Sequence, residues 1–371
     1  MVQGVHLRNL ASTEPRGTYV LRPGRIRQKE NTLKISWRTW LAAAAICSPL
    51  LAGAATPGDT PTQDGGLDAA IANGGIDVIT VQGASVYLGG EFTQVDGTPA
   101  NAIARWNGSR WSALGGGIVI APATAQSIGA IIEHAGFVYV GGSFSSAGGN
   151  PVHNIARWDG QSWSAVGSSS LANGGPASVS SMAVYQGKLY ASGRFEFGDG
   201  RPDDSVAAWD GQRWSRVGDG FANGAISSLR VFRSELIAGG DFTEAGGVPA
   251  RNLARWNGSS WAALSDLVAT PIVRMEASDT QLVAASRGDS LFAPASIYTW
   301  NGQRLTQLPL PGAGALRDIA AWGDEIYYEG YRFIPHGPPD SVHFHWNGTA
   351  WSTSPRSQFV IGNVLLAMDA G

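Results

Sequence analysis

The sequence repeats one short phrase six times, and this repeat constrains the fold more than any other feature. Each copy has a tryptophan, an Asn or Asp, a glycine, two variable residues and a closing Trp or Leu. The first tryptophans of successive copies are 52, 51, 47, 44 and 46 residues apart. A period in this range is typical of chains built from equivalent structural units. The residues concerned are Trp106 and Trp111, Trp158 and Trp163, Trp209 and Trp214, Trp256 and Trp261, Trp300 and Leu305, and Trp346 and Trp351.

Each repeat contains four short β-rich runs bounded by turn residues. In the first repeat these are Ile76–Gln82, Val86–Gly90, Ala102–Trp106 and Arg110–Leu114. The 50 glycines and 19 prolines of the chain suit many short strands and tight turns. Stacking four-stranded antiparallel sheets round an axis covers both faces of each sheet and shortens exposed edges. The sequence therefore predicts an all-β, six-bladed β-propeller over residues 73–355, with a linear β-solenoid as the alternative.

The repeated phrase also predicts a hairpin in every blade. Asn107-Gly108 is a strong hairpin signal, because both central residues of a two-residue turn need positive φ. That turn would pair Trp106 with Ser109, whereas a four-residue loop would pair Trp106 with Trp111. In either register the two rings lie on one face of the sheet. We expect these tryptophans to be structural and to pack between neighbouring sheets.

A longer motif surrounds the phrase. Its pattern, G-G-x-F-T-x-x-G-G-x-P-x-x-N-x-A-R-W-[ND]-G-x-x-W, occurs at Gly89–Trp111, Gly141–Trp163 and Gly239–Trp261, and more loosely at Ser192–Trp214. It resembles the kelch-like repeats of exported bacterial proteins and fungal cortical polarity-marker proteins, and the galactose-oxidase type of propeller. The resemblance covers about residues 73–355 and implies the propeller fold, but it implies no ligand.

The N-terminal region differs from the rest of the chain. Residues 1–40 carry eight basic and two acidic side chains, and the apolar run Leu41–Ala55 follows. This pattern predicts a signal peptide over residues 1–55 and a secreted, periplasmic or envelope protein, with an uncleaved anchor as the alternative. Residues 56–72 resemble a linker. Of 26 basic and 29 acidic residues, 18 and 27 remain without the leader, a net charge near −9.

That acidic balance disfavours nucleic acid as a partner, because nucleic-acid binding needs basic patches. The apolar run is also shorter than a membrane-spanning helix, so we expect no span in the mature chain. Without Cys47 the mature chain has no cysteine, which excludes the cysteine–tyrosine cross-link that the galactose-oxidase resemblance would imply for copper chemistry.

The C-terminal residues 356–371 hold a further β-rich run. Val360–Met368 resembles another first strand of a repeat. It predicts either a truncated seventh blade or a segment that packs across the seam between the sixth and first blades. Six blades are favoured over seven.

Residues that vary within a repeated frame are candidates for ligand selection. With strands alternating in direction, the long loops between the second and third strands share one face, and loops on rigid scaffolds often carry function. The residues just after the double glycine are expected round the mouth of a central channel, where they would bind a polar ligand. These are Glu91, Ser143, Arg194 and Asp241. Solvated loop residues are the alternative.

Three other groups are interpreted as structural. Asn101, Asn154 and Asn252 are predicted to recur at one loop position, which indicates turn chemistry. The acidic loop Asp199–Asp204 matches no complete calcium loop. His343 and His345 align with framework residues of the blades, and His336 is only a guess at a third metal ligand. We therefore predict no metal and no cofactor.

The expected function is an exported module that binds a glycan or a protein through its long-loop face. The chain contains no G-x-S-x-G, H-E-x-x-H or phosphate-loop motif within the propeller region. Two alternatives stay open: a polysaccharide hydrolase or lyase that uses loop carboxylates from different blades, and a structural module of a surface assembly.

Overall fold

The computed structural model describes residues 72–120, 127–167, 178–194, 206–222, 224–286, 295–310, 315–332, 340–353, 360–361 and 364–365. Every regular element in these ranges is a β-strand. In the same ranges, no helix is present that could cross a membrane. The predicted leader, nearly all of the linker, the acidic loop Asp199–Asp204 and His336 lie outside them.

Six antiparallel sheets of four strands dominate the described residues, one for each copy of the repeat. The first sheet contains β1 (Gly75–Gln82), β2 (Ser85–Glu91), β5 (Ile103–Trp106) and β6 (Trp111–Ala113). The second contains β8 (Ser127–His134), β9 (Phe137–Ser143), β12 (Ile155–Trp158) and β13 (Trp163–Ala165). The third contains β14 (Ser178–Tyr185), β15 (Lys188–Arg194), β16 (Val206–Trp209) and β17 (Trp214–Arg216).

The later repeats follow the same order of strands. The fourth sheet contains β19 (Ala225–Phe232), β20 (Glu235–Asp241), β23 (Leu253–Trp256) and β24 (Trp261–Ala263). The fifth contains β25 (Ile272–Ala277), β26 (Leu282–Ser286), β27 (Ser296–Trp300) and β28 (Leu305–Leu308). The sixth contains β29 (Ala315–Trp322), β30 (Glu325–Arg332), β31 (Asp340–Trp346) and β32 (Trp351–Thr353). The all-β class and the four strands per repeat are thus confirmed.

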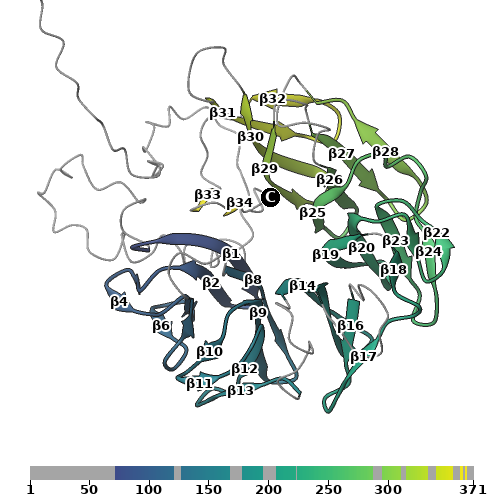
Figure 1. Ribbon diagram of the computed structural model, residues 1–371. Coiled ribbons are helices and arrows are strands. Elements are labelled where there is room, and N and C mark those ends of the chain that lie inside the picture. The colour runs from purple at the N-terminus through teal and green to yellow at the C-terminus, as the bar shows by residue number, and fades with distance from the viewer. Residues whose placement is uncertain are drawn as a thin grey trace, which may run out of the picture.

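The sheets follow one another round a common centre, each with its first strand innermost (Figure 1). The first strands of successive sheets are in contact from β1 and β8 through to β25 and β29. Between the sixth and first sheets lies a short hairpin of β33 (Val360–Ile361) and β34 (Val364–Leu365), and β34 contacts both β1 and β29. The single strand predicted over Val360–Met368 is therefore replaced by two short strands that pair with each other.

The hairpin of the repeated phrase has a four-residue loop, as the direct pairing of Trp106 with Trp111 shows. Gly108 has a φ of 97°, but Asn107 is not among the residues with positive φ, so the two-residue alternative is wrong. The reason is local hydrogen bonding by the Asn side chain. Asn107 Oδ1 accepts the backbone N–H groups of Ser109 at 3.0 Å and Arg110 at 3.1 Å, which stabilises the longer loop.

The second tryptophan of each phrase joins neighbouring sheets in the first half of the molecule. The indole N–H of Trp163 donates to the carbonyl of Leu114 in the preceding repeat, with a nitrogen–oxygen distance of 2.6 Å. Trp214 and Trp261 make the equivalent bonds at 2.8 and 3.0 Å. Packing of these rings between sheets is therefore confirmed. The side chain of Leu305 has no N–H group, so the fifth repeat cannot form this side-chain bond.

Ion pairs join the later sheets instead. Arg230 on β19 meets Glu276 on β25 at 2.6 Å, and Arg274 on β25 meets Asp318 on β29 at 3.0 Å. Asp318 is almost fully buried. A carboxylate removed from water in this way needs a charged partner, so each pair ties adjacent inner strands together.

The long loops contain small sheets that the sequence did not predict. β3 (Gln94–Val95) pairs with β4 (Thr98–Pro99). In the second repeat β10 (Ser146–Ala147) lies between β11 (Asn150–Pro151) and β7 (Ile118–Val119), and in the fourth β21 (Glu244–Ala245) lies between β22 (Val248–Pro249) and β18 (Phe221–Ala222). The loop phenylalanines Phe92, Phe144 and Phe242 are buried. The repeated loop motif therefore has a structural role.

Candidate binding site

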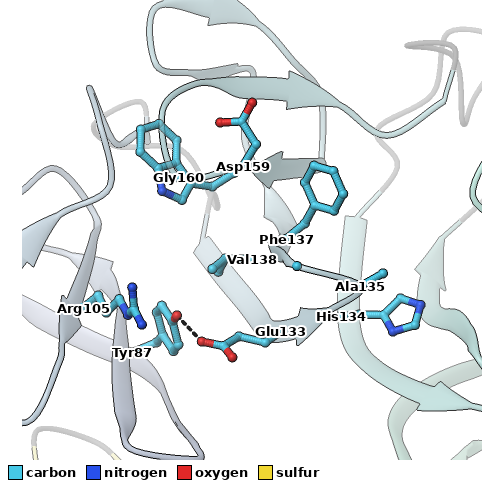
Figure 2. Close-up of a pocket in the computed structure, with 11 residues that line it drawn as sticks. Tyr87, Arg105, Glu133, His134, Ala135, Phe137, Val138, Asp159 and Gly160 are labelled. Atoms are coloured by element: carbon cyan, nitrogen blue, oxygen red, sulfur yellow. Dashed lines mark hydrogen bonds between the residues drawn. The ribbon is translucent and has the colours of Figure 1, made fainter.

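A hollow of about 440 Å³ lies between the first and second sheets, at the end where β8 turns into β9 and β12 into β13. The antiparallel strands put the long loops at the opposite end of the sheets. We define the hollow by its lining residues: Tyr87, Arg105, Glu133, His134, Ala135, Gly136, Phe137, Val138, Trp158, Asp159 and Gly160. Figure 2 shows Arg105 and Tyr87 on one side with Glu133 facing them, and Phe137 and Asp159 across the hollow.

Tyr87 connects the two sheets at the base of this site. Its hydroxyl donates a hydrogen bond to Oε1 of Glu133, and its ring is fully buried. Burial raises the pKa of Tyr87, and the adjacent Glu133 carboxylate raises it further. Tyr87 therefore stays protonated and acts as a fixed donor to the carboxylate. The backbone N–H of Glu133 also donates to Gln82 Oε1 at 2.6 Å, which holds this residue in place.

Arg105 is fixed by its own sheet. Its Nε and Nη2 donate to Ser85 Oγ at 3.2 and 2.9 Å, and its guanidinium lies 5.8 Å from the centre of the Tyr87 ring. Two polar atoms beside Tyr87 have no hydrogen-bond partner among the described residues: Arg105 Nη1 and Glu133 Oε2. Both side chains are exposed. The hollow thus offers one charged donor and one charged acceptor.

The opposite wall is aromatic and acidic. Trp158 is partly exposed, as is Trp346 in the sixth sheet, whereas the equivalent Trp106, Trp209, Trp256 and Trp300 are buried. The guanidinium of Arg157 lies 4.7 Å from the centre of the Phe137 ring. Asp159 Oδ1 accepts backbone N–H groups at 2.7 and 2.8 Å in its own turn, and these bonds lower its pKa. Trp158 therefore offers an accessible ring beside a second carboxylate.

Glu133 breaks the repeat at this position. In each sheet, one first-strand residue lies opposite the second-strand residue that pairs with the first tryptophan, and Glu133 has this position in the second sheet. The other five are Val81, Val184, Val231, Ala277 and Ala321. An apolar residue is therefore the framework choice, and the second sheet carries a carboxylate in its place. The departure is visible in the sequence once the first strands of the six repeats are aligned.

The four predicted ligand residues lie elsewhere, at the ends of their second strands. The register places each opposite the first residue of the innermost strand of its sheet, so they are structurally equivalent. Glu91 and Asp241 are exposed and Ser143 is partly exposed, while the side chain of Arg194 lies outside the described residues. They are not part of the hollow, and their role in binding stays a prediction.

The asparagine prediction is correct for two residues and wrong for the third. Asn154 and Asn252 have φ values of 65° and 62°, and their Oδ1 atoms accept the backbone N–H groups of Phe144 and Phe242 at 3.3 and 3.4 Å. The residue at this position in the first repeat is Ala102, with a φ of 58°. Asn101 is one residue earlier and instead donates to the carbonyl of Gly116 at 3.3 Å.

The C-terminal histidines occupy framework positions. His345 lies opposite Tyr327 as Arg105 lies opposite Tyr87, and its ring stacks on Tyr327 with centres 4.6 Å apart. Its Nε2 is 3.2 Å from Glu325 Oε2. His343 pairs with Glu329 in the strand register. Within the described part of the chain, no three His, Cys, Asp or Glu side chains gather as metal ligands would.

Comparison with known proteins gives no assignment. A scan against protein-family models finds no match to this chain, and a search of curated proteins finds no significant relative. The likeness to kelch-type repeats therefore rests on the repeated motif and on the four-stranded antiparallel sheets that it forms.

Proposed function

We propose that this protein is an exported, kelch-like, six-bladed β-propeller that acts as a saccharide-binding module. The ring is supported by the contacts between successive first strands and by β34, which touches the first strands of both the first and the last sheet. In this proposal the C-terminal hairpin fills the seam and no seventh blade forms. Export is supported by the basic and apolar pattern of residues 1–55.

One observation carries the binding function: the hollow holds polar groups that the framework does not use. Arg105 Nη1 and Glu133 Oε2 lack partners among the described residues, beside a partly exposed Trp158. A concave site with an aromatic wall and a few fixed polar groups is the usual form of a small-ligand site. The hollow therefore favours a polar ligand of limited size over a broad protein surface.

This proposal moves the binding site to the face opposite the long loops. The repeated residues of the long loops are accounted for by buried phenylalanines and small sheets. Glu133 in the hollow has no such explanation, because it replaces an apolar framework residue. We therefore place the ligand at the hollow and keep Glu91, Ser143, Arg194 and Asp241 as a secondary surface.

A pair of matched variants tests this function. Arg105→Gln changes a residue of the hollow, whereas Arg255→Gln changes the equivalent strand position of the fourth sheet, where the arginine pairs with Glu235 at 3.3 Å. We expect the full-length chain to bind a saccharide saturably in calorimetric titration and to release no product by mass spectrometry. Arg105→Gln should weaken binding and Arg255→Gln should not. Equal binding by both variants, or the appearance of cleaved sugar, would contradict the proposal.

A further inference from the structure

We infer that the ligand is a neutral saccharide, held by two neighbouring hydroxyl groups between Arg105 and Glu133, with one sugar ring against Trp158. This inference rests on the proposed function and adds the chemical class of the ligand. Three properties of the hollow support it: its balance of charges, its unused hydrogen-bonding atoms and its exposed indole.

The charges of the walls disfavour an ionic ligand. Glu133 and Asp159 would repel an anionic sugar, because their carboxylates lie on the same hollow. Arg105 would repel a cationic group placed beside Glu133. A like charge brought into a partly enclosed site costs more than the same charge in open water. A neutral, polyhydroxylated ligand is repelled neither by the carboxylates nor by Arg105.

The unused atoms suit a pair of adjacent hydroxyls. One hydroxyl can accept a hydrogen bond from Arg105 Nη1 while its neighbour donates to Glu133 Oε2. Tyr87 lies between the two side chains and already donates to the other carboxylate oxygen of Glu133 (Figure 2). Ser85 holds the other nitrogens of Arg105. Both ligand-binding groups are therefore fixed before binding, which reduces the entropy cost of ordering them.

The aromatic wall can take the apolar face of a sugar ring. Trp158 lines the hollow and is partly exposed, whereas Trp106, Trp209, Trp256 and Trp300 are buried at the same repeat position. Trp346 in the sixth sheet is also partly exposed. Phe137 is less available, because the Arg157 guanidinium already lies over its ring. Apolar contact with Trp158 and the two hydrogen bonds to the hydroxyl pair would thus act on one sugar unit.

The test uses named sugars and variants that keep the framework. Neutral probes are cellotetraose, maltotetraose, mannotetraose and laminaritetraose, and charged probes are tetragalacturonate and the glucosamine tetramer, each titrated into the full-length chain by calorimetry. Glu133→Val installs the residue that the third and fourth sheets carry at this position, so the strand should form normally. Glu133→Gln keeps an acceptor for Tyr87 while removing the charge.

We expect at least one neutral probe to bind and both charged probes to fail. Glu133→Val should weaken that binding by about tenfold or more, since hydrogen bonds to charged groups contribute most strongly, and Glu133→Gln should weaken it less. An analogue of the bound sugar with one hydroxyl of the pair methylated should lose a similar factor. Glu133→Val and the methylated analogue combined should lose little more than either alone, because both remove the same contact.

The outcomes separate this inference from the proposed function. If only a charged probe binds, and binding weakens in Arg105→Gln, the neutral-diol inference is overturned while saccharide binding at the hollow stands. Losses from Glu133→Val and from the methylated analogue that simply add would also overturn the inference. If no probe binds, or if neither Arg105→Gln nor Glu133→Val changes the affinity, the proposed function fails as well.

Discussion

Two junctions of the molecule are built from the same repeat, but they carry side chains of different charge. At the first junction, between the first and second sheets, Tyr87 lies beside the charged Arg105 and Glu133. At the third junction, between the third and fourth sheets, the equivalent of Tyr87 is Tyr190. The equivalents of Arg105 and Glu133 there are Ala208 and Val231.

The equivalent side chains also differ in how deeply they are buried at the two junctions. Tyr190, Ala208 and Trp256 pack together in one apolar cluster at the third junction. At the first junction, Arg105 is exposed and Trp158, the equivalent of Trp256, is partly exposed. The backbone and the tryptophan hairpin are the same in both places. The first junction therefore keeps the arginine of the repeated motif and adds one acidic replacement, Glu133, where the third junction carries apolar side chains.

The largest difference in stability between the two junctions should come from replacing Trp256 and Trp158 by alanine. Trp256→Ala removes a buried ring from the packed junction and should lower the free energy of unfolding by about 3–5 kcal/mol. Trp158→Ala removes a partly exposed ring, so it should cost less than half as much while abolishing saccharide binding. Urea unfolding of both variants measures the difference. Equal losses of stability would mean that Trp158 belongs to the framework.

Substitutions at position 208 of the third junction and position 105 of the first should change the stability by different amounts. Ala208→Arg forces a long cationic side chain into a packed cluster and should destabilise the protein by about 2 kcal/mol or more. Arg105→Ala acts on an exposed side chain and should change stability by about 0.5–1 kcal/mol at most. Thermal unfolding of the two variants tests this. A tolerated Ala208→Arg would show that the third junction also has room for a ligand.

Much of this framework could be predicted from sequence, because it is repeated. Four strands per repeat and tryptophans packed between sheets follow from the recurring phrase and from the alternation of side chains along a strand. The hairpin register did not follow, since the side chain of Asn107 caps two backbone N–H groups and selects a longer loop than Asn-Gly alone suggests. The small loop sheets could not be predicted either, because their two-residue strands are too short to show a periodic pattern.

The candidate site was hidden for a different reason. Glu133 stands out only when the first strands of all six repeats are aligned, and its meaning depends on Tyr87 and Arg105, which lie 46 and 28 residues earlier in the chain. The predicted ligand residues vary at the ends of the second strands, where the long loops begin. The structure instead brings together strand residues from adjacent sheets, a juxtaposition that requires the strand register and the packing of one sheet on the next.

The smallest expected effect concerns the turn carboxylates. Asp159 and Asp210 occupy the same hairpin position, and backbone hydrogen bonds within each turn lower the pKa of both. A carboxyl with a lowered folded-state pKa stabilises the protein above its unfolded-state pKa, and this contribution disappears as the pH falls through the folded-state value. Asparagine occupies this position in the other four repeats, so Asp159→Asn and Asp210→Asn should each have little effect at neutral pH.

The pH dependence of unfolding provides the measurement for these two variants. The stability of the double variant should fall less steeply than that of the wild type as acid is added, with the two single variants in between. Only Asp159→Asn should also alter saccharide binding, because Asp210 is not part of the hollow. Identical acid profiles for all four proteins would show that these turn bonds do not contribute.

Hydrogen exchange with and without a bound sugar tests the central claim most directly, since it shows which backbone segments a ligand protects. The full-length chain is compared alone and with the neutral tetrasaccharide that binds it most tightly. We predict slower exchange at Glu133–Val138 and Trp158–Ser162, and no change at the equivalent third-junction turn Val231–Leu236. Protection confined to the strand ends at Glu91, Ser143 and Asp241, or absent while calorimetry detects binding, would contradict a site at the first junction.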